Sequence, residues 1–205
     1  MKLYYVHDPM CSWCWAFRPV LIELKKKLPS NIRFIRLLGG LAADSDTPMP
    51  EETKQYVIDN WHRIQQQLPK TKFNYDFWTN CQPRRSTYPA CRAVIAARKQ
   101  GLKYDDIMTH EIQQAYYLQA KNPSDNQTLI ALAQNIGLDT DQFNQDLIST
   151  DTHQALAHEL NTAQSLQLNS FPSFLLTDGE RGLHINPDYT QADVILEKIQ
   201  HALPN

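Results

Sequence analysis

The sequence predicts an α/β fold built from a strand–helix–strand unit at the N-terminus and a strand–strand–helix unit at the C-terminus. Strand-like runs lie near the two ends of the chain, apolar residues recur at helical spacing through the middle, and a Cys-x-x-Cys pair follows the first strand. We therefore expect a mixed α/β domain, formed by residues 1–44 and 169–205, and an all-helical insertion domain at 45–168.

The N-terminal unit begins with a short apolar strand at 3–6, and Asp8-Pro9 marks the turn after it. A helix is expected over 11–28, with Pro19 kinking it, because its apolar residues fall at helical spacing: Phe17, Val20, Leu21, Leu24 and Leu28. A second strand is expected over 31–38. A strand–helix–strand unit of this length predicts a parallel pair with a right-handed crossover.

The middle of the chain has helical periodicity throughout. Helices are expected at 51–68, 87–100, 104–119, from 124 to before Gly137, from 139 onward, and at 152–166. Ser124 with Gln127 and Asp139 with Gln142 each match a capping box, which predicts where two of these helices begin.

The strand pattern returns at the C-terminus. Segments 173–177 and 182–185 flank Asp178-Gly179, which is typical of a hairpin. Thr190 is expected to cap a final helix that contains Val194, Ile195 and Ile199.

Charge and hydropathy exclude some classes of function. The net charge is −2 and there is no long basic run, so nucleic acid is not an expected partner. No apolar stretch approaches the roughly 20 residues that cross a bilayer, and the N-terminus looks like a strand rather than a signal peptide. No membrane partner is expected, and the predicted location is cytoplasmic.

Cys11-Ser12-Trp13-Cys14 stands at the start of the first expected helix. A thiolate is the nucleophile in disulfide exchange, and the N–H groups and dipole of a helix N-terminus stabilise such an anion. The spacing brings the second sulfur one turn below the first, close enough for the two to form a disulfide. The pair therefore predicts an exchange in which one sulfur attacks a substrate disulfide and the other resolves the mixed disulfide.

The alternative for a Cys-x-x-Cys pair is half of a zinc site, which needs a second pair of ligands at a set spacing. Cys81 and Cys91 have nine residues between them, and His153 and His158 have four, but no pattern links either pair to the motif. The spacings therefore favour redox chemistry, and neither a metal nor a cofactor is expected.

These motifs resemble the DsbA family of the thioredoxin superfamily. The Cys-x-x-Cys pair follows the first strand, Pro19 stands five residues after Cys14, and a helical insert precedes Phe171-Pro172. The stretch 8–15, DPMCSWCW, is most similar to the cytoplasmic FrnE-like branch, which is described as predicted protein-disulfide isomerases. The resemblance implies a thioredoxin-like fold with Cys11 as nucleophile and Cys14 as resolving thiol.

The resemblance also implies a cis Phe171–Pro172 bond facing the cysteines, with the Phe171 side chain close to the reactive sulfur. Trp13, Phe171 and Pro172 are then the expected substrate-binding residues, and disulfide- or thiol-containing proteins, and also glutathione, are the expected partners. Periplasmic DsbA proteins carry a histidine between their cysteines, whereas this chain has Ser12-Trp13. We therefore expect a less oxidising couple.

Two other functions remain open on the same fold. One is a glutathione-dependent transferase or isomerase, of the kappa-class or hydroxychromene-carboxylate isomerase type, although such enzymes typically carry serine where this chain has Cys11. The other is a non-catalytic redox sensor.

Several single residues also have two interpretations. Asp8 is either a proton acceptor for the resolving thiol or, as we favour, a turn residue. Trp13 is expected to face solvent, and Trp15 to pack internally. Cys91 is expected to be buried and inert, and Cys81 to lie in a polar loop, with a disulfide between them left open.

Overall fold

The computed structural model describes residues 1–202, which divide into two compact units. The first comprises Met1–Gly39 and the chain from Glu159 onward, and the second comprises Gly40–His158. The chain re-enters the first unit at Glu159, inside helix α8 (Thr150–Ser165). This is ten residues before residue 169, where the sequence predicts that the first domain resumes. At this point Glu159 accepts a hydrogen bond from the backbone N–H of Leu38 at 2.7 Å, which ties α8 to the end of β2.

The first unit is built on a four-stranded sheet of order β2-β1-β3-β4. Its strands are β1 (Lys2–His7), β2 (Arg33–Leu38), β3 (Ser173–Thr177) and β4 (Gly182–Ile185). The β1–β2 pair is parallel and the other two pairs are antiparallel, so the expected parallel crossover and hairpin are both present. The unit is therefore the α/β fold that the sequence predicts.

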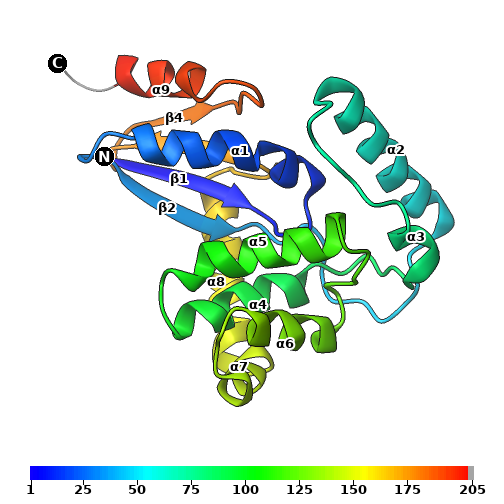
Figure 1. Ribbon diagram of the computed structural model, residues 1–205. Helices are drawn as coiled ribbons and strands as arrows, with labels where there is room; N and C mark the ends of the chain where they lie inside the picture. The colour runs from blue at the N-terminus through cyan, green and yellow to red at the C-terminus, as the bar shows by residue number, and fades with distance from the viewer. Residues whose placement is uncertain (203–205) are drawn as a thin grey trace. The chain divides into compact units, whose positions relative to one another are not determined.

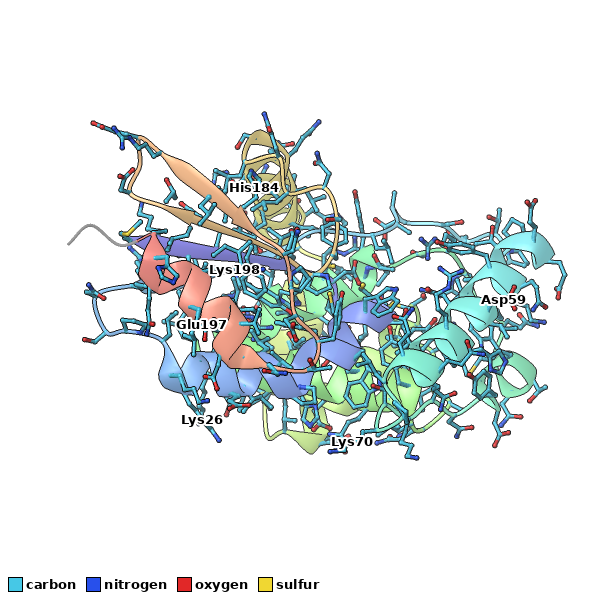
Figure 2. The ribbon with its side chains drawn as sticks, turned by 90° about the horizontal axis from the view of Figure 1, so that it is seen from above. Lys26, Asp59, Lys70, His184, Glu197 and Lys198 are labelled. Carbon is cyan, nitrogen blue, oxygen red and sulfur yellow. The ribbon has the colours of Figure 1, made fainter. Side chains whose placement is uncertain are left out.

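Helices α1 (Ser12–Lys27) and α9 (Ala192–His201) cover one face of this sheet (Figure 1). Alternate strand residues point at them and form the main core, together with Phe17, Val20, Leu24, Ile195 and Ile199. The other face carries a smaller core, which strand residues form together with the end of α8 and the loop after it. Its buried members are Val6, Leu37, Ala163, Leu168 and Leu175. The outer sides of the two helices are charged, with Lys26, Glu197 and Lys198 exposed (Figure 2).

The second unit is all-helical. It contains α2 (Glu51–Gln67), α3 (Phe77–Asn80), α4 (Tyr88–Lys99), α5 (Tyr104–Tyr117), α6 (Asn126–Asn135), α7 (Thr140–Leu147) and the first part of α8. Helix α4 is central and contacts α5, α6 and α7. The four-residue helix α3 was not expected, because it spans only about one turn and an apolar pattern needs several turns to show a period. Phe77 and Trp78 bring it into an aromatic cluster around Trp61.

Two expected helix caps are wrong and one is confirmed. The Ser124 hydroxyl donates to the Ser86 carbonyl at 2.7 Å, so α6 begins after Asp125 without a side-chain cap. Thr190 is not a cap either, because its hydroxyl donates to the Asp188 carboxylate at 2.8 Å and α9 begins after Gln191. Asp139 does cap α7 by accepting from the Gln142 backbone N–H at 2.9 Å.

Within residues 1–202, no helix combines the length and the apolar character that a membrane crossing requires.

Candidate functional site

The turn after β1 places Cys11 at the N-terminus of α1. The Cys11 N–H donates to the Asp8 carbonyl at 3.1 Å, and its carbonyl accepts from the Trp15 N–H at 3.0 Å, which starts the helix. The exposed fraction of Cys11 is only 6%, against 1% for Cys14. No cysteine in the described part of the chain forms a disulfide.

Burial raises the pKa of the Cys14 thiol well above its ordinary value. The neighbouring Cys11 sulfur raises it further, because a second negative charge nearby disfavours ionisation. A hydrogen bond from the Asp8 backbone opposes both effects but does not outweigh them. At neutral pH Cys14 therefore remains a thiol.

The segment before β3 is brought to the cysteines by the register of the sheet. Ser173 at the start of β3 pairs with Val6 near the end of β1, so Pro172 lies beside the turn that leads to α1. The Phe171–Pro172 peptide bond is cis, as expected, and the Cys11 thiol donates to the Phe171 carbonyl at 3.4 Å. Two segments far apart in sequence thus meet at one sulfur.

The Phe171 ring packs against Gly39, at the end of the first segment of this unit. A Cβ atom at position 39 would overlap the ring, so only glycine leaves the space it occupies. The ring also packs against the smaller core of the sheet. The contact with Cys11 is therefore made by the backbone of Phe171, whereas its side chain anchors the segment.

Asp8 is a turn residue, the alternative that the sequence favoured. Its side chain is fully buried, and its carboxylate accepts from the Met10 N–H at 2.7 Å. The same carboxylate makes a small contribution to the raised pKa of Cys14. Asp8 thus holds the segment that enters α1.

A set of polar and aromatic side chains on the strands beneath α1, which no sequence motif marks, also belongs to the surroundings of the cysteines. His7 is buried and stacks on Tyr5, with ring centroids 5.2 Å apart, and its Nε2 lies 3.1 Å from Nη2 of Arg36. Burial and the charge of Cys14 raise the pKa of Tyr5, while Arg36 opposes them. The Cys-x-x-Cys motif itself contains no positively charged residue, but Arg36 brings a positive charge close to Tyr5 from β2. The two-residue periodicity of β1 was the available signal, since it puts Tyr5 and His7 on one face.

Tyr189 was also missed. It lies between β4 and α9, and its ring contacts the ring of Trp13 with centroids 5.0 Å apart. Trp13 is consequently half-buried, where the sequence suggested a solvent-facing residue. No local motif marks Tyr189, because only the fold brings it to α1.

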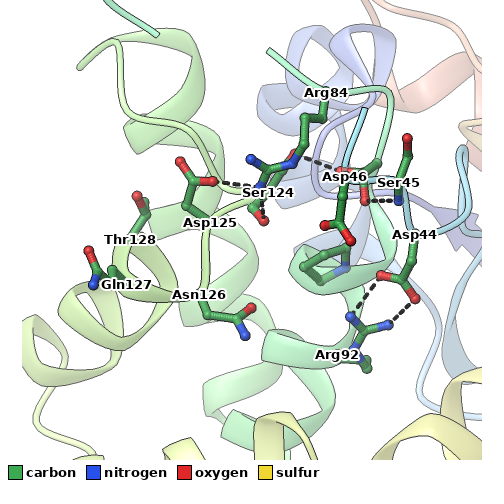
Figure 3. A pocket seen from close by; sticks show the side chains of 12 residues that line it. Asp44, Ser45, Asp46, Arg84, Arg92, Ser124, Asp125, Asn126, Gln127 and Thr128 are labelled. Carbon is green, nitrogen blue, oxygen red and sulfur yellow. Dashed lines mark hydrogen bonds and ion pairs between the residues drawn. The ribbon is translucent and has the colours of Figure 1, made fainter. Parts of the chain in front are cut away.

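The helical unit contains a polar cavity of about 510 Å³ between α4 and the start of α6 (Figure 3). Two arginines line it, and both are paired with carboxylates of the same chain. Arg92 contacts Asp44 through two bonds of 2.8 Å, and Arg84 contacts Asp125 at 2.5 Å. This cavity therefore presents no unpaired cation to a ligand.

The remaining two cysteines also belong to the helical unit. Cys91 is fully buried in α4, as expected. Cys81 is half-buried, and its thiol donates to the Ala120 carbonyl at 3.1 Å. Burial raises the pKa of Cys81, which disfavours its thiolate. No group of three or more metal-ligating side chains occurs among residues 1–202.

Among curated proteins, the ClpXP adapter protein SpxH of Bacillus subtilis (strain 168) is 28% identical over 196 residues. The match covers 93% of this chain and 64% of SpxH. SpxH of Halalkalibacterium halodurans is 26% identical over 197 residues, with 92% and 63% covered. The chain thus spans slightly less than two thirds of the length of these relatives.

Solved structures show the same fold. A protein from Nitrosomonas europaea, provisionally named a protein disulfide isomerase, has a TM-score of 0.84 at 22% identity, covering 98% of this chain and 96% of its own. The cytosolic disulfide reductase DsbM from Pseudomonas aeruginosa has a TM-score of 0.76 at 21% identity, covering 99% and 100%. DsbM has also been solved with GSH. The family model described as thioredoxin matches residues 4–196. Because this match covers almost the whole chain, the protein belongs to the thioredoxin family.

Proposed function

We propose that the protein is a thiol–disulfide oxidoreductase that exchanges disulfides with peptide or protein substrates through Cys11 and Cys14. The observation that carries the proposal is the arrangement of three groups: Cys11 at the N-terminus of α1, Cys14 one turn inside it, and the Phe171 carbonyl against the Cys11 sulfur. Thioredoxin-family membership and the oxidoreductase names of the structural neighbours support it.

The different exposure of the two cysteines supports the roles that we propose for them. Cys11 is the more accessible and attacks a substrate disulfide, forming a mixed disulfide and releasing one substrate thiol. Cys14 is then the resolving thiol: it loses its proton and attacks the Cys11 sulfur, which releases the second substrate thiol. Burial and the Cys11 sulfur raise the pKa of Cys14, and formation of the mixed disulfide removes the negative charge of Cys11 and therefore lowers one of these barriers to its ionisation.

Trp13, Phe171 and Pro172 form the proposed substrate-binding surface. The half-buried Trp13 offers apolar area beside the sulfurs, and the Phe171 backbone offers a carbonyl to an extended chain. Thiol-containing proteins and glutathione are the proposed partners, in the cytoplasm. The names of cytosolic DsbM and of its GSH-bound structure support these choices.

An adapter function is a second candidate, favoured by the similarity to SpxH over 93% of this chain. An adapter works by binding a partner, so it would not require turnover at the cysteines. The transferase and redox-sensor alternatives also remain distinct from the proposal, because a transferase would conjugate glutathione to an electrophile and a sensor would change conformation without turnover.

Reduction of insulin disulfides, combined with equilibration of the protein against reduced and oxidised glutathione, tests the proposal. Turnover that is lost in both Cys11→Ser and Cys14→Ser supports it. A wild-type protein that forms no intramolecular disulfide at any glutathione ratio would exclude it. Partner binding that persists in the double cysteine variant would favour the adapter function instead.

A further inference from the structure

Tyr189 lies against the flank of α1 that carries the buried thiol. Its ring makes edge contacts with Trp13 and Phe17, at centroid distances of 5.0 and 5.7 Å. Trp13 directly precedes Cys14, and Phe17 lies three residues after Cys14 on the same side of the helix. The two contacts therefore place Tyr189 beside Cys14.

The segment that carries Tyr189 is fixed by Asp188. Its Oδ1 accepts from the Thr190 N–H, the Thr190 hydroxyl and the Gln191 N–H, each at 2.8 Å. The ring of Tyr189 is also packed against the main core of the sheet. The side chain is thus positioned before any substrate binds.

The hydroxyl of Tyr189 has no hydrogen-bond partner among residues 1–202. Burial raises its pKa above the ordinary value, and the charges of Cys14 and Cys11 raise it further. The hydroxyl therefore stays protonated at neutral pH, within electrostatic reach of both sulfurs. It is a hydrogen-bond donor whose pKa responds to the charges of the two sulfurs that are ionised during exchange.

We propose that Tyr189 donates a hydrogen bond to the Cys14 sulfur while that sulfur is ionised, and is thus a positioning residue for the resolving step. This inference rests on the proposed function. In the step, the Cys14 S–H bond breaks and its proton passes to solvent. The thiolate then attacks Cys11, the Cys11–Cys14 bond forms, and the bond from Cys11 to the substrate sulfur breaks. The departing substrate thiolate takes a proton from solvent, and over the whole exchange two electrons pass from the cysteine pair to the substrate.

The test uses Ellman's reagent and stopped-flow absorbance, because the reagent releases one coloured thiol at each step. Reduced wild-type protein should give a first phase for attack by Cys11 and a second for resolution by Cys14. In Tyr189→Phe the second phase should slow about tenfold, as expected for losing one hydrogen bond to a charged group, and its pH midpoint should rise. The first phase should change little.

Tyr4→Phe is the matched control, since it removes a hydroxyl from a half-buried tyrosine that packs on the opposite face of the sheet. Tyr189→Gln keeps a donor without the ring and should recover part of the second-phase rate, which a purely structural role would not allow. An unchanged second phase and pH midpoint in Tyr189→Phe would overturn the inference. A wild-type protein that releases only one coloured thiol would instead overturn the proposed function.

Discussion

The sulfur of Cys11 lies 3.4 Å from the carbonyl oxygen of Phe171, a residue 160 positions further along the chain. The β1–β3 pairing creates this contact, because Val6 and Ser173 are paired at the end of these strands from which the chain enters α1. The helical unit is inserted between the two segments that meet there. The candidate site is therefore complete only when both parts of the first unit have folded together.

Cys11 should react before Cys14 with iodoacetamide in the reduced protein. Cys11 has the larger exposed fraction, 6% against 1%, and the raised pKa of Cys14 keeps that residue as an unreactive thiol. Peptide mapping by mass spectrometry after short exposure should find the label on Cys11. In a substrate-trapping experiment, Cys14→Ala should accumulate mixed disulfides and Cys11→Ala should not. Preferential labelling of Cys14 would contradict the assigned roles.

Gly39→Ala should destabilise the protein by about 1–3 kcal/mol, the usual cost of overpacking a filled space. The added Cβ would meet the Phe171 ring, which is held by the smaller core. Urea denaturation of the reduced protein measures the change, and the alkylation rate of Cys11 should change as well because the Phe171 carbonyl shifts. In a Phe171→Ala background the same substitution should cost much less. Additive effects in this double-mutant cycle would show that the two positions are not coupled.

The local elements could be predicted because their signals are local. The apolar spacing of α1 and the Asp178-Gly179 turn each specify one element, and the return of strands after a helical block predicts that the insertion is nested. The caps failed where another group competed for the capping hydroxyl: the distant Ser86 carbonyl accepts from the Ser124 hydroxyl, and the neighbouring Asp188 carboxylate accepts from that of Thr190.

The cysteine pair was evident from its spacing, but its surroundings were not. Arg36 lies on β2 and Tyr189 in the loop before α9, and no sequence motif near either residue indicates that a thiol lies close to it. Sheet register determines which distant residues meet, and periodicity alone does not specify that register. For the same reason the small exposed fraction of Cys11 follows from packing that the motif does not encode.

Trp13 should report the redox state of the cysteine pair. It lies between Cys11 and Cys14 in sequence, and a disulfide quenches nearby indole emission. Reduction should change the tryptophan fluorescence, and Trp13→Phe should remove most of the change, since Trp13 directly precedes Cys14. Trp15→Phe is the matched control, because Trp15 is also half-buried on α1. A change that survives in Trp13→Phe would point to Trp15 or to a wider rearrangement.

The reduced protein should lose stability at alkaline pH because of Cys14. Its pKa in the folded state is raised above the ordinary value of 9.0 by burial and by Cys11, so the folded protein retains this proton after the unfolded chain has released it. Stability from this group is fully present below the unfolded pKa and declines as the pH rises from there towards the folded pKa, by at most about 1.4 kcal/mol per pH unit.

Urea denaturation under reducing conditions, at a series of pH values from about 7 to about 10.5, measures this decline. Cys14→Ser places a side chain of similar shape there that does not ionise in this range, so its stability should fall less steeply with pH than that of the wild type. The buried Tyr5 is present in both proteins, so the part of its raised pKa that comes from burial cancels in the difference, and the part that comes from the charge of Cys14 belongs to the effect being measured. Parallel curves for the two proteins would mean that the Cys14 thiol ionises as readily in the folded state as in the unfolded chain, and the resolving step would then need no help from its surroundings.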